Sequence, residues 1–418
     1  MIRGIKGVKD LLPEDLSRWQ VIEGAARRFS HLYGFREIRV PIFEVTELFA
    51  RSIGASTDIV EKEMYTFQDR DGSSLTLRPE ATAGVVRAFI EHNLAAKPTA
   101  QKFYYLGPMF RHERPQAGRL RQFHQYGVES FGSAAPQADA EVITLLWRFL
   151  TSLGLQDLTL EVNSLGDAAD RAAYKATLVA FLDKRQGDLC ANCQRRLATN
   201  PLRVLDCKVP GCRTATADAP RLVDHLSPGS REKFDLVLQQ LSSVGIPYQL
   251  NSRLVRGLDY YCHTTFEVTT THLGAQNAVG AGGRYDGLVE TLGGPPTPAV
   301  GFAVGLERVA LMLPETAVPA PAPTVFVAGF GVRGAAGGLR LLEELRQAGI
   351  PAQTDYGATT LKALLRQADR HGARFAAIIG DDEVAKGHLI LRDMQSKAQQ
   401  EVPLATAAAR ILALVKPQ

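Results

Sequence analysis

Residues 107–125 read GPMFRHERPQAGRLRQFHQ, and this stretch decides how the middle of the chain folds. A β-strand is predicted just before it, over 102–106, and a second one begins inside it, over 122–129. The two strands form a hairpin whose loop is much longer than the usual two to about five residues. Long connections inside compact domains are usually functional, so the hairpin loop is the first candidate for a site.

The hairpin carries polar chemistry on its loop and on its second strand. Five side chains of the loop are suited to phosphate groups: Arg111, His112, Arg114, Arg119 and Arg121. Because side chains alternate along a strand, one face of the second strand presents Phe123, Gln125, Gly127 and Glu129. An aromatic ring, an amide and a carboxylate that follow one another along one face of a strand are suited to a pocket that stacks a base and hydrogen-bonds an amino acid. This segment alone is equally compatible with a solvated hairpin and an incidental cluster of charges.

Length and composition limit the class of protein. A chain of 418 residues is expected to form about two or three domains, and its 45% hydrophobic and 22% charged residues are ordinary for a globular protein. The net charge of +4 permits nucleic-acid binding without arguing for it. Five cysteines argue against a secreted disulfide framework. The chain has no apolar run long enough for a membrane span and no signal peptide, so we expect a cytoplasmic protein with no membrane partner.

Changes in composition divide the chain into domains. Prolines that alternate with alanine and valine predict an extended linker at 314–324. Beyond it, strands alternate with helices, which predicts a small α/β domain over 325–418. Residues 168–250 are rich in helix formers and contain none of the chemical motifs, so we interpret them as a mostly helical insertion. The expected main domain takes the remaining two segments, 1–167 and 251–313.

Individual elements can be placed at both ends of the chain. Apolar residues recur at helical spacing between Pro13 and Gly34, which suit a helix start and a helix end. A strand over 36–40 follows and stops at Pro41. In the last hundred residues the pattern predicts strands at 325–330, near Ile350, at 375–379 and at 388–391, with helices at 339–345, 361–368 and 405–415.

Familiar nucleotide-binding and catalytic motifs are absent from the sequence. It contains no P-loop, no dinucleotide fingerprint, no GxSxG elbow and no HExxH pair. A nucleotide would therefore be held by some other arrangement.

Several segments resemble the motifs of the class II aminoacyl-tRNA synthetases. Residues 107–125 resemble motif 2 in its histidyl form, and 300–308 (VGFAVGLER) resemble motif 3, a strand that runs into a helix. Residues 34–41 resemble the dimer-forming motif 1. Two further segments, 254–261 (LVRGLDYY) and 280–288 (GAGGRYDGL), are similar to the two histidine-specific signatures of the histidyl-tRNA synthetases.

A substrate loop of the same family is also recognisable. Residues 77–84 (LRPEATAG) match it, with Ala81 where glycine is more usual. The neighbouring Glu80 and Thr82 are retained, so this departure is small.

The resemblance implies a fold and a reaction. The fold is an α+β catalytic domain, with an antiparallel sheet flanked by helices, a mostly helical insertion and a C-terminal α/β anticodon-binding domain. The reaction is that of a histidine–tRNA ligase, which activates L-histidine with ATP and Mg²⁺ and then transfers histidine to the 3′-terminal adenosine of tRNA(His). The resemblance also implies a homodimer.

Residue roles follow from the same resemblance. Histidine would be bound by Glu80, Thr82, Arg111, Gln125, Glu129, Arg256, Tyr260, Tyr261 and Tyr285. ATP would be bound by Arg111, Glu113, Arg119, Phe123 and Arg308. Arg256 and Arg111 would act on the α-phosphate as the catalytic residues. The acceptor end of the tRNA would meet Arg114, Gln116 and Arg121. Mg²⁺ would take most of its ligands from the nucleotide, so no dedicated protein site is expected for it.

Four cysteines of the insertion leave two interpretations open. Cys190 and Cys193 form one close pair, and Cys207 and Cys212 form a second pair with looser spacing. Four thiolates in such pairs could bind structural zinc, or they could be reduced, partly buried thiols.

Two other functions compete with the ligase. One is the related regulatory subunit of ATP phosphoribosyltransferase, which keeps the fold but does not charge tRNA. The intact segment 254–261, the two ATP arginines and the C-terminal domain oppose it. The other is a prolyl or threonyl enzyme of the same class, which the two histidine-specific signatures oppose.

Overall fold

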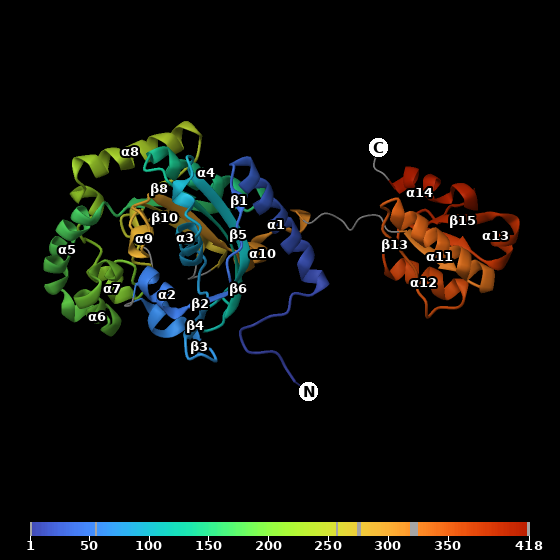
Figure 1. Ribbon diagram of the computed structural model, residues 1–418, viewed down its shortest axis with the longest axis horizontal. Helices are drawn as coiled ribbons and strands as arrows, with labels where there is room; N and C mark the ends of the chain where they lie inside the picture. The colour runs from blue at the N-terminus through green and yellow to red at the C-terminus, as the bar shows by residue number, and fades with distance from the viewer. Residues whose placement is uncertain (1, 55–56, 256–257, 274–276, 318–324, 416–418) are drawn as a thin grey trace. The chain divides into compact units, whose positions relative to one another are not determined.

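The computed structural model describes residues 2–54, 57–255, 258–273, 277–317 and 325–415. Contacts along the chain group into two compact units, Met1–Val318 and Pro319–Gln418. Figure 1 shows the elements of both units. In the described parts of the chain, no helix is both long and apolar enough to cross a membrane.

The first unit is built on an eight-stranded sheet, as the α+β prediction requires. Its inner strands pair antiparallel, whereas the two edge strands pair parallel with their neighbours. The strand order is β1 (Arg36–Glu37), β5 (Gln101–Phe110), β6 (Gln122–Phe131), β11 (Ala299–Gly305), β10 (Ala278–Arg284), β9 (Cys262–Thr270), β7 (Leu158–Ser164) and β8 (Gln249–Leu250).

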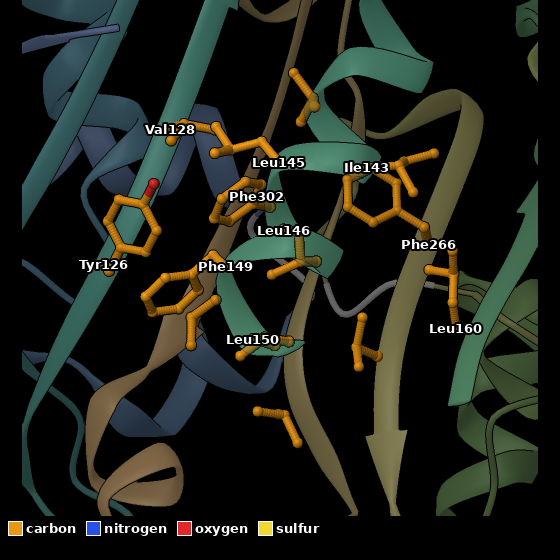
Figure 2. Close-up of a cluster of buried hydrophobic side chains, with 14 of the residues drawn as sticks. Tyr126, Val128, Ile143, Leu145, Leu146, Phe149, Leu150, Leu160, Phe266 and Phe302 are labelled. Carbon is orange, nitrogen blue, oxygen red and sulfur yellow. The ribbon is translucent and has the colours of Figure 1, made fainter. Parts of the chain in front are cut away.

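One face of this sheet is covered by helix α4 (Pro136–Ser152). Figure 2 shows Phe149 of this helix beside Tyr126 of β6, with Phe302 of β11 close by. The centroid of the Tyr126 ring lies 4.9 Å from that of Phe149 and 5.5 Å from that of Phe302, in edge-to-face geometry. The Tyr126 hydroxyl keeps a polar partner, Ser30 Oγ at 2.9 Å on helix α1 (Pro13–Leu32). Burial of each such ring contributes about 2–3 kcal/mol, so this cluster anchors α1 and α4 to the sheet.

The opposite face of the sheet has its own apolar layer. Alternate residues of β6 point there, and Phe131 stacks at 4.5 Å on Phe89 of helix α3 (Thr82–Glu91). A three-stranded sheet and several short helices complete this side: β2 (Phe43–Val45), β4 (Ser74–Leu77), β3 (Tyr65–Gln68), α2 (Thr46–Ile53), the π-helix η1 (Ile59–Glu63), the 3-10 turn η2 (Leu94–Ala96) and α9 (Leu288–Thr291). Helix α10 (Leu306–Met312) instead packs with α1 and α4 on the first face.

The insertion is mostly helical, as predicted. A capping box between Asp167 and Asp170 starts its first helix, because each side chain accepts from the other residue's backbone N–H. Its elements are α5 (Ala168–Asp183), η3 (Gln186–Asp188), α6 (Ala191–Thr199), η4 (Pro201–Val204), α7 (Pro210–Ala215), η5 (Leu222–His225) and α8 (Pro228–Ser243).

The second unit is a five-stranded sheet with helices, as the α/β prediction requires. The strand order is β13 (Ala352–Gln353), β12 (Val325–Gly329), β14 (Phe375–Ile379), β15 (His388–Asp393) and β16 (Gln399–Pro403). The helices are α11 (Val332–Gln347), α12 (Leu361–Arg370), α13 (Asp381–Lys386), η8 (Leu404–Thr406) and α14 (Ala407–Val415). Two elements, α13 and β16, were not predicted, because short polar segments give little periodic signal.

Several predicted element edges were wrong. The first hairpin strand, expected to end at 106, runs on to Phe110, and the helix expected from 339 begins at Val332. The strand expected over 36–40 ends at Glu37; the Ile38 N–H still donates to the carbonyl of Tyr104 at 2.8 Å, but the carbonyl of Val40 accepts from the Arg78 guanidinium at 2.8 Å. The linker expected to be extended from residue 314 instead begins with a 3-10 turn, η7 (Glu315–Ala317), whose last residue packs on the core of the first unit.

Candidate active site

A cavity of about 290 Å³ opens over the sheet face that carries Glu129. Twelve of the predicted site residues line it: Glu80, Thr82, Arg111, Glu113, Arg119, Phe123, Gln125, Glu129, Tyr260, Tyr261, Tyr285 and Arg308. These residues come from segments more than two hundred positions apart in the sequence. The structure therefore gathers the residues proposed for histidine and for ATP in one place. The predicted catalytic residue Arg256 lies outside the described residues.

The floor of the cavity follows the predicted alternation of β6. Two glycines make room for the polar side chains above it. Gly127 pairs with Tyr105 of β5, and a Cβ on this glycine would lie 2.3 Å from the tyrosine ring. Gly301 of β11 pairs with Glu129, and a Cβ there would lie 2.0 Å from the carboxylate. Any side chain at either glycine would displace a group of the site.

The deep end of the cavity is built around the Glu129 carboxylate. It accepts hydrogen bonds from Thr82 Oγ1 at 2.7 Å, from the Tyr285 hydroxyl, and from the Tyr105 hydroxyl at 3.5 Å. Only 1% of Glu129 is exposed, and this burial raises its pKa to about 8. Three donors around one acid form a polar site that can recognise a ring nitrogen.

A second buried acid lies near the first. Glu80 accepts from the backbone N–H groups of Thr82 at 2.6 Å and Ala83 at 3.0 Å, which caps the first turn of α3. Burial raises the pKa of Glu80, and the two N–H bonds oppose this rise. The amide oxygen of Gln125, which lines the same cavity, is buried and has no hydrogen-bond partner among the described residues. An unpaired acceptor and a buried acid in one cavity are groups that a bound ammonium group would satisfy.

The outer end of the cavity is cationic. Arg111 donates from Nε to the carbonyl of Pro79 at 2.8 Å, and its guanidinium carbon lies 5.3 Å from the centre of the Phe123 ring. Arg308 donates to the carbonyls of Ala278 and, at 3.4 Å, Gly118. These backbone bonds hold two guanidinium groups at the wall of the cavity, where phosphate oxygens could be bound.

A third arginine of this end is paired with an acid. Arg119 forms an ion pair with Glu113. Burial lowers the pKa of Arg119 and also that of Arg308, which lies on the same wall. Arginine remains charged despite such shifts, so the outer end keeps its positive charge.

The residues predicted to meet the tRNA acceptor end lie outside this cavity. Arg114 and Gln116 border a neighbouring depression, which they share with Arg119. Arg121 lines neither space. Its Nε donates to the carbonyl of Glu113 at 3.4 Å, and its backbone N–H donates to Gly7 at 2.7 Å, so it ties the loop to the N-terminal segment.

Two adjacent tyrosines of the 254–261 segment both line the cavity. Neighbouring side chains on a strand would face opposite ways, but β9 begins only at Cys262, and Tyr260 and Tyr261 lie in the turn before it. Tyr285, which the resemblance assigns to histidine binding, donates a hydrogen bond to Glu129. Its ring also packs at 5.6 Å against that of Tyr260.

Two residues of the cavity were missed at the sequence level. Tyr105 contacts Glu129, and Glu307 accepts from the backbone N–H of His124 at 2.9 Å. Alternation along the first hairpin strand puts Tyr105 on the same face as Gly107, but the long loop leaves the register between the strands undetermined. Glu307 belongs to the motif 3 segment, where only the following Arg308 was assigned a role.

Comparison with known proteins identifies the family. A model of histidyl-tRNA synthetase matches residues 7–309, and a model of an anticodon binding domain matches residues 334–414. Histidine–tRNA ligases from Trichlorobacter lovleyi and Syntrophotalea carbinolica are 53% and 51% identical to the chain, over 98% and 96% of each protein and of this chain. The solved structure of apo histidyl-tRNA synthetase from S. aureus superposes with a TM-score of 0.83 at 37% identity, covering 99% of this chain and all of that one. The chain belongs to the histidyl-tRNA synthetase family.

Proposed function

We propose that the chain activates L-histidine with ATP and transfers it to the 3′-terminal adenosine of its tRNA. The observation that carries this proposal is the arrangement of the cavity. A buried acid surrounded by hydroxyl donors occupies the deep end, around Glu129, and arginines occupy the outer end. A ligand with a polar ring fits the deep end, and a nucleoside triphosphate fits the outer end.

In this proposal, the imidazole of histidine contacts Glu129 at the deep end. An amino acid without a ring N–H would leave the acid and the hydroxyls of Tyr285 and Thr82 unpaired with substrate, which disfavours its binding. The ammonium group of histidine is held by Glu80 and by the free amide oxygen of Gln125. Both ends of the amino acid then meet buried polar groups, and the ammonium group supplies the partner that the Gln125 amide oxygen lacks.

ATP occupies the outer end in this proposal. Adenine stacks on Phe123, Arg111 binds the α-phosphate, and Arg308 contacts the nucleotide from the opposite wall. Glu113 keeps Arg119 in place through their ion pair. Arg256, which the family resemblance implicates, would join Arg111 at the α-phosphate. Positioning and charge stabilisation then lower the barrier as the histidine carboxylate attacks, and no covalent enzyme intermediate is needed.

Mg²⁺ is the metal that this chemistry implies. The carboxylates of Glu113 and Glu307 line the arginine end of the cavity, and carboxylate oxygens are the ligands that Mg²⁺ prefers. Mg²⁺ bound with the nucleotide would neutralise part of the phosphate charge. Both carboxylates already have protein partners, Arg119 and His124, which fits an ion held mainly by the phosphates.

Transfer to tRNA uses surfaces outside the cavity. Arg114 and Gln116 lie in the depression next to it, where the acceptor end would approach. The second unit, which matches an anticodon binding domain, would bind the opposite arm of the tRNA. We further propose that the working form is a homodimer located in the cytoplasm, and analytical ultracentrifugation of the purified chain tests the dimer.

Amino-acid-dependent exchange of pyrophosphate into ATP tests the first half-reaction. With each of the twenty amino acids, ATP and Mg²⁺, we expect exchange with histidine alone. The Arg256→Ala variant should lose it. Folded protein that shows no exchange with histidine would overturn the proposal and favour a regulatory role for the chain. Charging of tRNA(His) transcript with labelled histidine then tests the second half-reaction.

A further inference from the structure

Four cysteines of the insertion converge at one point of the fold. Cys190 is the N-cap of α6, Cys193 lies in its first turn, Cys207 follows η4, and Cys212 lies in α7. Their four sulfur atoms all lie within 4.8 Å of one another, and Cys190 Sγ is 4.0 Å from Cys207 Sγ. All four are free thiols, and every one except Cys190 is buried.

We propose that these four sulfurs bind one structural Zn²⁺ ion. Zinc–thiolate bonds of about 2.3 Å place the sulfurs of a tetrahedral site roughly 3.8 Å apart, which matches the spacing of this cluster. The backbone N–H of Cys190 donates to Cys212 Sγ at 3.1 Å, a contact that favours the ionised ligand. A disulfide needs sulfurs about 2 Å apart, whereas a single thiophilic ion fits the observed cluster without rearrangement.

The chain around the cluster makes a zinc ion useful to the fold. The insertion elements that carry the cysteines are short, with nine residues in α6 and six in α7, so they have little intrinsic stability. Four bonds to one ion would tie these elements together and contribute directly to folding. The ion would sit in the apolar cluster formed with neighbours such as Leu189 and Leu205, away from water.

A chain of contacts connects the cluster to the proposed histidine site. Arg253 donates from Nη1 to the carbonyl of Thr216 at 2.8 Å and from Nη2 to that of Leu205 at 3.1 Å. Thr216 Oγ1 in turn donates to the carbonyl of Cys212 at 2.8 Å. Arg253 immediately precedes the signature segment 254–261, which carries two tyrosines of the cavity. Zinc would therefore fix Arg253, at the start of that segment. The effect of this on histidine binding rests on the proposed function.

Metal analysis of the full chain tests the zinc assignment directly. Protein expressed in zinc-supplemented medium and purified without chelators should contain one zinc ion per chain. The Cys193→Ser and Cys212→Ser variants should lose the ion, whereas the matched control Cys262→Ser, a buried thiol outside the cluster, should keep it. Wild-type protein with zinc far below one ion per chain overturns the proposal, as does a full complement of zinc in both cluster variants.

Two measurements on wild-type protein keep the test decisive if the variants fail to fold. Cobalt substitution should produce thiolate-to-metal charge-transfer absorption together with the visible bands of a tetrahedral ion, and their absence overturns the assignment. Titration with a mercurial should release zinc as four thiols are consumed.

Chelator-treated protein should then show a several-fold higher KM for histidine in pyrophosphate exchange. Zinc present in protein without exchange would refute the proposed function and leave the metal site standing.

Discussion

In the Glu129→Gln variant, the acid at the deep end of the cavity becomes a neutral amide of nearly the same shape. The amide oxygen can still accept from Thr82 Oγ1, now 2.7 Å from the carboxylate, and the amide N–H₂ can donate to the Tyr285 oxygen. Packing is therefore preserved. Above about pH 8, where the carboxylate is ionised, the bound histidine loses the charge on the acceptor that faces its imidazole.

The expected loss can be worked from the strength of that contact. Hydrogen bonds to charged groups contribute about 1.5–3 kcal/mol, and each 1.4 kcal/mol is about a factor of ten, so kcat/KM for histidine should fall roughly 10- to 150-fold. Pyrophosphate exchange at varied histidine concentration measures this loss. The KM for ATP should stay unchanged, because Glu129 lies at the end of the cavity away from the arginines.

The same substitution should also change how the free energy of unfolding depends on pH. Burial raises the pKa of Glu129 to about 8, against an ordinary value of 4.5. The folded chain therefore holds a proton between these values that the unfolded chain has lost, so this stabilisation is complete below 4.5 and is lost as the pH rises through 8. Glutamine does not titrate. Relative to the variant, the wild type should become steadily less stable from pH 5 to about 9 in urea titrations.

A matched control separates recognition from general loss of charge. Glu141→Gln removes a carboxylate on α4 that pairs with Lys102 Nζ at 2.6 Å outside the cavity, and it should leave kcat/KM for histidine unchanged. If Glu129→Gln is folded and its kcat/KM for histidine equals that of the wild type, Glu129 does not face the imidazole. Equal losses in both variants would also refute the reasoning.

Three further substitutions test the sheet that carries the site. Gly127→Ala puts a Cβ 2.3 Å from the Tyr105 ring, so it should lower stability by about 1–3 kcal/mol and kcat/KM for histidine as well; wild-type kinetics would contradict this placement. Arg284→Met leaves the buried carboxylate of Asp139 without its cation, and urea titration should show a loss of about 3–5 kcal/mol, largely restored by adding Asp139→Asn. Phe149→Ala should cost about 3–5 kcal/mol in the same assay with an unchanged m-value.

Local patterns in the sequence were sufficient to predict much of the fold. The α1 helix begins at Pro13 as predicted, and its C-cap, Tyr33, is followed by Gly34 at φ +76°, as the proline and glycine signals indicate. The β14 strand, Phe375–Ile379, has the predicted bounds because a buried β-rich run is a strong signal. The face shared by Phe123 and Glu129 was also correct, since alternation needs no knowledge of partners.

Contacts between distant residues could not be predicted in the same way. Beyond β1, the carbonyl of Val40 accepts from Arg78, 38 positions away, a partner that no local pattern indicates. The hydrogen bond from Tyr285, just after β10, to Glu129 of β6 joins residues 156 positions apart. Both tyrosines of the 254–261 segment reach the cavity because the chain turns before β9 begins at Cys262.

The polar groups of the cavity explain why specificity for the amino acid and stability of the empty protein are opposed. Glu80 and Glu129 are both buried with raised pKa, and the amide oxygen of Gln125 lacks a partner among the described residues. A core selected for stability alone would replace these groups by apolar ones. A ligand offsets this cost when it brings an ammonium group to Glu80 and Gln125 and a ring N–H to Glu129. Of these groups Glu129 is the one that discriminates, because every amino acid brings the ammonium group, whereas one without a ring N–H leaves the buried acid with no partner on the ligand.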